Sequence, residues 1–371
     1  MTTPNIDVNS GTEALLGFEF QRNCALLLLL DNYKSYIDKN YFISIEHYDD
    51  FLFGFRDAAN QQIEYIKSYQ AKKLSGSKWT ISALAEPTGK MLDVGASIHS
   101  DIAGKAPDFR TDLIFVSDRT IELKSDNLNK DNNKKATYDI ESIKVDSPYV
   151  PFKELSTILK GKIRDSVNDY SEHNYDDIEF DALGYEWVDL PKTPRNQLAI
   201  LETRVGENFD GVPDTKAALY VLLSLFKHIE TTYNKRKKIS LLDESKILEG
   251  DDIQSAVKVI NLESRTLEFW RKSAEEFCPK LKLPVGKSNK ASEYIGIAFE
   301  LFKDLNNQEH KNIFNFVRDN NFEDYCYNSP STIEMFVDGY YNSNIFSNSI
   351  EREDVIFAIV CAYVETRNIQ V

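Results

Sequence analysis

The chain has 371 residues, of which 42% are hydrophobic and 28% are charged, as in an ordinary soluble globular protein. At about 150 residues per domain, this length predicts two domains. The net charge of −15 argues against a protein that coats nucleic acid without regard to sequence, but it leaves room for a basic cleft in an acidic exterior.

The sequence carries no sign of export or of membrane insertion. The first residues, MTTPNIDVNSG, lack the basic stretch and apolar core of a signal peptide. No apolar run reaches the ~18 residues that a membrane span needs. The four cysteines lie far apart and form no C-x-x-C pair, as expected of reduced thiols. These features predict a cytoplasmic protein.

A helix is predicted over residues 12–37, because apolar side chains recur there at helical spacing. Five consecutive leucines, Leu26 to Leu30, predict that this helix is buried on all sides. Glu19 lies on the same helix. For this residue we favour a solvated or ion-paired role over a contribution to a metal site.

An acidic strand follows over Tyr41 to Phe53, YFISIEHYDDFLF. Its residues alternate with period two, which predicts one β-strand with two distinct faces. By this alternation Glu46, Tyr48 and Asp50 share a face, and Asp49 points the other way.

A second strand is predicted over Ile63 to Lys73, IEYIKSYQAKK, which alternates in the same manner. Gln70 and Lys72 project from one face of it, one pleat apart. Turn-forming residues fill the connection from Gly54 to Gln62, so the two strands are expected to pair as an antiparallel hairpin. Such a hairpin would bring Asp50 close to Gln70 and Lys72.

This pattern has a functional and a purely structural interpretation. An oxygen ligand can bind a divalent metal ion, and an ammonium one pleat away can contact the water beside that ion. This is the chemistry of a metal-dependent phosphodiesterase. Lysine is also common on the wet face of an edge strand, and two adjacent aspartates can close a strand in a turn. The hairpin by itself leaves both interpretations open.

The order of several short motifs carries a resemblance to a known family. The motifs are G-x-x-F-Q on the first helix (Gly17, Phe20, Gln21), E-x-x-D-D (Glu46, Asp49, Asp50), Y-Q-x-K (Tyr69, Gln70, Lys72) and a following Trp-Thr pair (Trp79, Thr80). This ordered set resembles the PD-(D/E)XK, or restriction-endonuclease-like, superfamily and, more narrowly, the nuclease domain of bacterial anti-phage effectors. The resemblance covers residues 1 to about 210. In one departure, Gln70 stands where the superfamily usually has a second acid.

The resemblance implies metal-dependent cleavage of double-stranded DNA in bacterial defence. Asp50 would bind Mg²⁺, or Mn²⁺, with the Gln70 amide oxygen and the Ala71 carbonyl as further ligands. Lys72 would orient the attacking water and balance the charge of the pentavalent phosphate. Glu46 would restore the negative charge that Gln70 lacks. The alternative, favoured by Gln70 itself, is a catalytically inactive nuclease fold that serves as a DNA-binding or scaffold subunit.

The remaining elements up to residue 238 predict an α/β core, with a mixed central sheet flanked by helices. Residues 111–116, TDLIFV, form the continuous apolar run of a buried central strand. Trp79 is expected to pack on the sheet. Further predictions are helices within 82–97, 151–170 and 212–238, a strand within 197–205, an irregular acidic segment at 171–196 and an exposed loop at 125–137.

Residues 239–371 are predicted to form a separate all-helical domain for oligomerisation or partner binding. Helices are expected at 251–261, 264–278, 291–305, 308–321, 331–341 and 351–367. The last is apolar on most sides, so it is either core or buried against a partner. The fragment V-G-K-S at 285–288 lacks the upstream glycine of a phosphate-binding loop and is interpreted as a turn.

Because the resembled nucleases often act beside a HerA-like hexameric ATPase, we expect a homo-oligomer or such a partner. A protein whose helical half alone is functional is a third possibility.

Overall fold

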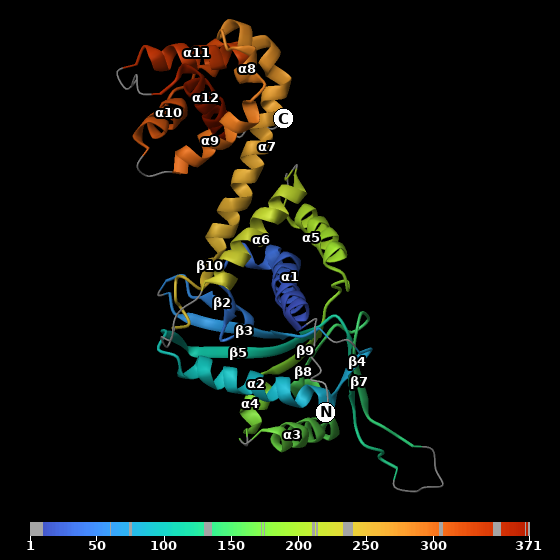
Figure 1. Cartoon of the computed structure of the whole chain (residues 1–371). Helices are drawn as coiled ribbons and strands as arrows, with labels where there is room; N and C mark the ends of the chain where they lie inside the picture. The colour runs from blue at the N-terminus through green and yellow to red at the C-terminus, as the bar shows by residue number, and fades with distance from the viewer. Residues whose placement is uncertain are drawn as a thin grey trace, which may run out of the picture. The chain divides into compact units, whose positions relative to one another are not determined.

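The structure is a computed structural model that describes residues 10–59, 61–73, 76–129, 136–171, 173, 175–209, 212, 214–232, 240–303, 307–343, 350–367 and 369 (Figure 1). By internal contacts the chain divides into two compact units. The first comprises Met1–Asn208 and Leu219–Ile253, and the second comprises Phe209–Ala218 and Gln254–Val371.

The first unit is built on a mixed sheet. Within the described residues its strands are ordered β10-β1-β2-β3-β5-β9-β8. Their bounds are β1 (Asn40–His47), β2 (Asp49–Arg56), β3 (Ile63–Ala71), β5 (Lys105–Ser117), β8 (Tyr149–Pro151), β9 (Leu183–Trp187) and β10 (Ile247–Glu249). Strands β10, β1, β2 and β3 pair antiparallel, whereas β3, β5 and β9 pair parallel. The predicted α/β core with a mixed sheet is confirmed.

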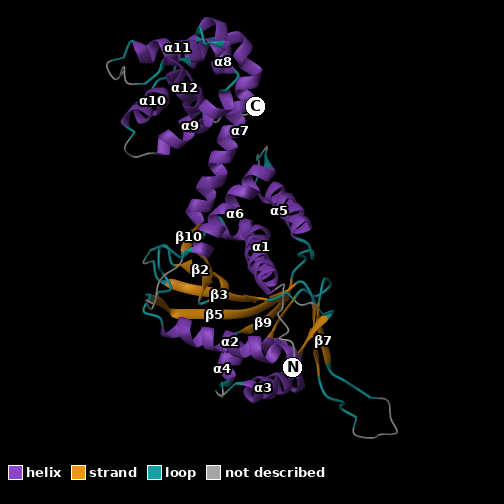
Figure 2. Cartoon of the chain, in the orientation of Figure 1, coloured by secondary structure: helices purple, strands orange, loops and turns teal. Residues whose placement is uncertain are grey.

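Helices cover both faces of this sheet (Figures 1 and 2). On one face lies α1 (Ser10–Tyr36), against which α5 (Pro194–Asn208) packs. The other face carries α2 (Ile81–Ser100) and α3 (Thr157–Tyr170). The other helical segments are η1 (Phe152–Glu154), α4 (Asp177–Asp181) and α6 (Thr215–Thr231). Leu26 to Leu30 are all buried, as the run of leucines predicted.

A small sheet, β4-β6-β7, accompanies the main one. It consists of β4 (Lys78–Thr80), β6 (Thr120–Lys124) and β7 (Ile140–Ile143). Trp79 of β4 is buried, donates its indole N–H to Ser117 Oγ at 2.9 Å and meets the Phe115 ring edge-on. The packing role expected of Trp79 is therefore confirmed. Within the predicted loop 125–137, residues 130–135 lie outside the described part of the chain.

The single strand predicted over 41–53 is wrong. The chain reverses within it, between β1, which ends at His47, and β2, which begins at Asp49. Glu46 and Tyr48 take left-handed backbone angles, with φ of 53° and 67°, to make this tight turn. Both strands are buried on both faces, so no change in composition marks the reversal. The turn contains no glycine that would have indicated it.

Two further predictions fail between residues 171 and 205. The strand expected within 197–205 is part of helix α5, where Gln197, Leu201 and Val205 are buried at a spacing of four residues. The segment 171–196, expected to be irregular, contains α4 and the parallel strand β9. Strand β9 is short and includes Gly184 and Glu186, which weakens its apolar signal.

The second unit is helical, as predicted. It contains most of α7 (Gly250–Lys280), together with α8 (Val285–Ser288), α9 (Ala291–Lys303), α10 (Gln308–Asp319), η2 (Glu323–Tyr325), α11 (Ser329–Tyr341) and α12 (Arg352–Thr366). Helix α7 merges the two helices expected at 251–261 and 264–278. Every residue from Val355 to Val364 of α12 is buried, and Phe357 stacks between Trp270 and Tyr294. Helix α12 is therefore the core of its own unit. In no described helix is there a long enough apolar stretch to cross a membrane.

Candidate nuclease site

The pairing of β2 with β3 sets the geometry of the candidate site. These strands are antiparallel, with Phe51 opposite Tyr69, so Asp50 lies at the end of β3 beside Gln70. The antiparallel hairpin predicted from the sequence is thus present, although β2 extends to Arg56 rather than Phe53.

Asp50 is the point on which the predicted site residues converge. Its Oδ2 accepts hydrogen bonds from the backbone N–H of Ala71 at 2.8 Å and from Gln70 Nε2. The ammonium of Lys72 lies 3.3 Å from the same oxygen. The structure therefore brings together four residues singled out in the sequence, three of them through direct contacts with one carboxylate oxygen.

The main chain holds Lys72 firmly while its side chain stays accessible. Its N–H donates to Val116 O at 3.0 Å, and its carbonyl accepts from Ser117 Oγ at 2.8 Å, so β5 fixes the backbone just past the end of β3. The Lys72 side chain is 40% exposed, against 12% for Asp50. An ammonium in this position faces both the carboxylate and solvent.

Asp49 belongs to the same site, contrary to the prediction that it points away. Its Oδ2 accepts from Ser68 Oγ at 3.0 Å, and its Oδ1 accepts from the N–H of Asp50 at 3.0 Å. Burial, followed by repulsion from Asp50, raises the pKa of Asp49 to about 7. The turn at Tyr48 breaks the alternation on which the prediction rested, so parity cannot be counted from Glu46 to Asp50.

Glu46 lies at the exposed rim of the site. Partial desolvation, then repulsion from Asp50 and Glu230, raises its pKa to about 7, while Lys72 and Lys246 act in the opposite direction. Three carboxylates thus influence one another here. A cation would relieve their repulsion.

The site opens into a cavity of about 480 Å³. It is lined by Glu46, His47, Tyr48, Asp49, Asp50, Gln70, Lys72, Lys90, Asp93 and Val94. The sequence prediction missed the last three, which come from helix α2. Their spacing along α2 puts Lys90 and Asp93 on one side of that helix, but nothing local in the sequence links this side to the hairpin.

The donor atoms fit a hard divalent cation. The candidate ligands are the Asp50 carboxylate, the Gln70 side-chain amide and the Ala71 carbonyl. In a strand the N–H and C=O of one residue point to the same side, so the Ala71 carbonyl lies on the side of Asp50. Rotation of the Gln70 amide would turn Oε1 towards the same point. Oxygen donors of this kind suit Mg²⁺ or Mn²⁺.

The carboxylates of the site do not form a ready-made metal centre. In the described part of the chain no three His, Cys, Asp or Glu side chains are arranged to hold a metal ion. Among the candidate ligands, Gln70 supplies an oxygen but no charge. Elsewhere in the motif set, Gln21 is buried on α1, and its Oε1 has no hydrogen-bond partner among the described residues.

A mixed sheet with an aspartate at the start of one strand and Gln-x-Lys at the end of its neighbour fits the restriction-endonuclease-like fold that the sequence resemblance implied. The chain belongs to the family described as Cap4, dsDNA endonuclease domain, whose family model matches residues 9–228, more than half of the sequence. This is a nuclease domain of anti-phage defence systems. No curated protein and no solved structure gives a significant match. The chain thus carries a DNA endonuclease domain of the defence type.

Proposed function

We propose that the protein is a metal-dependent endonuclease that hydrolyses phosphodiester bonds of double-stranded DNA in bacterial anti-phage defence. The observation that carries this proposal is the convergence of Gln70, Ala71 and Lys72 on the carboxylate of Asp50. The family match over residues 9–228 supports the substrate and the biological setting.

Asp50, the Gln70 amide oxygen and the Ala71 carbonyl would hold Mg²⁺ or Mn²⁺. When bound, the ion would supply Lewis-acid stabilisation and a water of lowered pKa. Lys72 orients the attacking water and stabilises the negative charge that builds up on the phosphate. The water oxygen bonds to phosphorus as the bond to the departing sugar oxygen breaks; the attacking water loses one proton to solvent, and the departing oxygen takes one up from solvent. Glu46 adds, at the rim, the negative charge that Gln70 lacks.

Replacement of Lys72 provides the most direct test. Lys72→Ala should abolish cleavage of supercoiled plasmid, while gel-shift affinity for DNA without metal and the melting temperature stay near wild-type values. Lys73→Ala is the matched control, because the Lys73 ammonium instead donates to Lys192 O at 2.9 Å. Wild-type nicking by Lys72→Ala, or cleavage that persists in excess chelator, would refute the assignment.

A second candidate function is a DNA-binding or scaffold subunit without catalysis. The amide at Gln70 favours it, as does the lack, among the described residues, of three acids arranged to hold a metal ion. The same plasmid assay separates the two functions, since a scaffold binds DNA but leaves plasmid intact at every Mg²⁺ and Mn²⁺ concentration.

We further propose that residues 239–371 serve assembly, in a cytoplasmic homo-oligomer or with a HerA-like hexameric ATPase. Helix α12 is buried in the core of its own unit, so its apolar side chains cannot contact a partner. The contact surface would instead be formed by exposed side chains such as Tyr325 (75% exposed), Tyr327 and Ile297 (44% exposed). Oligomers usually close by symmetry, so light scattering of the full chain should give one defined even-numbered species. A monomer that cleaves DNA at full rate would contradict this proposal.

A further inference from the structure

Residues 240–249, here called the strap, lie beyond the family match yet run beside the candidate site. At one end β10 pairs with β1, with Ser44 opposite Ile247. Ser44 Oγ donates to Lys246 O at 2.8 Å, and His47 Nε2 lies 3.0 Å from Ser240 O. The strap therefore follows β1 to its last residue, next to the turn that precedes Asp49 and Asp50.

Asp101, at the end of α2, ties the strap to that turn. Its Oδ2 accepts from the hydroxyl of Tyr48 and from the N–H of Leu241 at 3.3 Å, and its Oδ1 accepts from the N–H of Ala103 at 2.8 Å. Burial raises the pKa of Asp101, but these three hydrogen bonds and the charge of Lys105 outweigh it, and the net shift of the pKa is downward. Asp101 is therefore held as a charged acceptor, which strengthens each bond.

The strap is itself anchored by buried groups. Leu241 is fully buried, and Lys246 is 5% exposed. The Lys246 ammonium donates to the carbonyls of Ile229 at 3.2 Å and Glu230 at 3.5 Å, which lie near the end of α6. Carbonyls at a helix C-terminus lack partners within the helix, and a cation there is stabilised by the helix dipole. The position of the strap is thus well defined.

The turn needs such support. Tyr48 has a left-handed φ of 67°, and Glu46 one of 53°, which cost free energy in residues with a Cβ. Asp49 and Asp50 come directly after this turn. Resting on the nuclease function above, we propose that the hydrogen-bonded latch Tyr48–Asp101–Leu241 positions the turn so that Asp50 meets Gln70, Ala71 and Lys72. Tyr48 and Asp101 are positioning residues, and the strap is part of the working nuclease.

The test uses full-length variants. Tyr48→Phe keeps the ring and removes the hydroxyl, and its single-turnover cleavage rate should fall about tenfold, with DNA affinity in chelator unchanged. Hydrogen exchange of the amides of residues 46–51 should become faster. Tyr65→Phe is the matched control, because it removes another tyrosine–aspartate hydrogen bond, that to Asp112, from the same sheet. It should change neither quantity.

A conservative variant separates positioning from folding. Asp101→Asn keeps an acceptor and should retain more activity than Asp101→Ala, at similar melting temperatures. Unchanged exchange at residues 46–51 in Tyr48→Phe would overturn the latch, whatever happens to cleavage. Faster exchange in Tyr48→Phe but not in Tyr65→Phe would support the latch, even if the wild-type protein proved unable to cut DNA. Failure of the wild-type protein to cut DNA would refute the nuclease function instead.

Discussion

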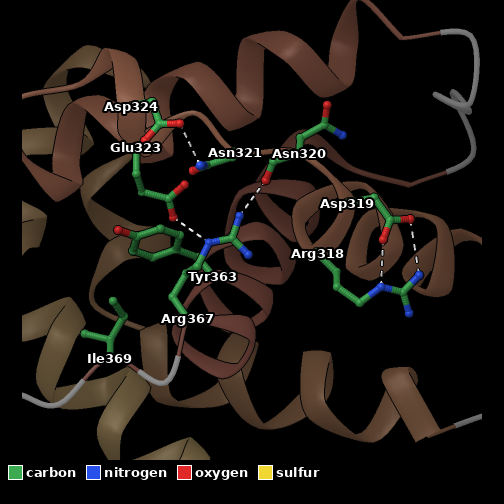
Figure 3. A pocket seen from close by; sticks show the side chains of 9 residues that line it. All are labelled: Arg318, Asp319, Asn320, Asn321, Glu323, Asp324, Tyr363, Arg367 and Ile369. Atoms are coloured by element: carbon green, nitrogen blue, oxygen red, sulfur yellow. Dashed lines mark hydrogen bonds and ion pairs between the residues drawn. The ribbon is translucent and has the colours of Figure 1, made fainter.

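Charged side chains are arranged differently at the candidate site of the first unit and around Arg367 of the second unit. At the candidate site of the first unit, Asp49 and Asp50 are adjacent, Glu46 lies at the rim, and Lys72 pairs with Asp50. In the second unit the charge of Arg367 is paired with a carboxylate within the fold (Figure 3). It pairs with Glu323 at 2.6 Å and donates to the carbonyls of Val317 and Asn320.

This difference shows where chemistry is built into the chain. Carboxylates placed close together raise one another's pKa and destabilise the fold, so such groups persist mainly where function requires them. A guanidinium that joins a carboxylate to two backbone carbonyls braces a loop against a helix end. On this comparison the clustered carboxylates of the first unit support the proposed reactive site, whereas Arg367 serves the architecture of the second unit.

Replacement of Asp50 should lower cleavage more than any other change predicted here, if the first unit carries the chemistry. Asp50→Asn keeps the shape of the side chain but removes the charge that faces Lys72, and cleavage should fall by about 10²–10³-fold or more. The melting temperature should hold or rise, because Asp49 and Glu46 lose a repelling neighbour. Plasmid cleavage and thermal unfolding measure the two quantities. A large fall in stability with little loss of cleavage would mean that Asp50 is structural.

Phe357→Ala tests whether the second unit depends on its packed core for stability. This ring is buried between Trp270 and Tyr294, at centroid distances of 4.5 and 4.7 Å. Its loss should destabilise the helical unit by about 3–5 kcal/mol. Calorimetry should show the transition of that unit at a lower temperature while that of the nuclease unit stays in place. A single transition that shifts as a whole would show that the units unfold together.

Sequence patterns predicted the contacts between neighbouring strands but not those made across the chain. Hairpin pairing was enough to bring Asp50 to Gln70 and Lys72. The turn at Tyr48 was hidden because both flanking strands are apolar and buried, and Asp49 was misplaced as a result. His47 and Ser240 are 193 residues apart, and no local pattern could have indicated their contact.

Gln70 offers a way to change the charge balance of the site. Gln70→Glu adds a carboxylate beside Asp50, so Mn²⁺ should bind several-fold more tightly by calorimetry, since charge count tunes cation affinity. Without metal the variant should be less stable than wild type, because another like charge is confined there. Gln70→Ala should weaken Mn²⁺ binding. Equal affinities in all three proteins would exclude Gln70 from the metal site.

Replacement of Glu186 on β9 should give the smallest effect on stability. It tests whether a carboxylate outside the candidate site also lowers the stability of the fold when it is charged. Burial raises its pKa to about 7, with Lys67 opposing the shift. The folded protein thus holds this proton more tightly than the unfolded chain. The resulting stability is complete below the unfolded pKa of 4.5 and is lost as the pH rises to about 7.

In chelator, the wild-type melting temperature should therefore fall between pH 5 and pH 7.5 by a few degrees more than that of Glu186→Gln. The amide cannot ionise, so this variant lacks the contribution of the group but keeps its size. Glu64→Gln, at an exposed position of strand β3, is the control and should leave the slope unchanged. Parallel slopes in wild type and Glu186→Gln would mean that Lys67 fully compensates the buried charge of Glu186.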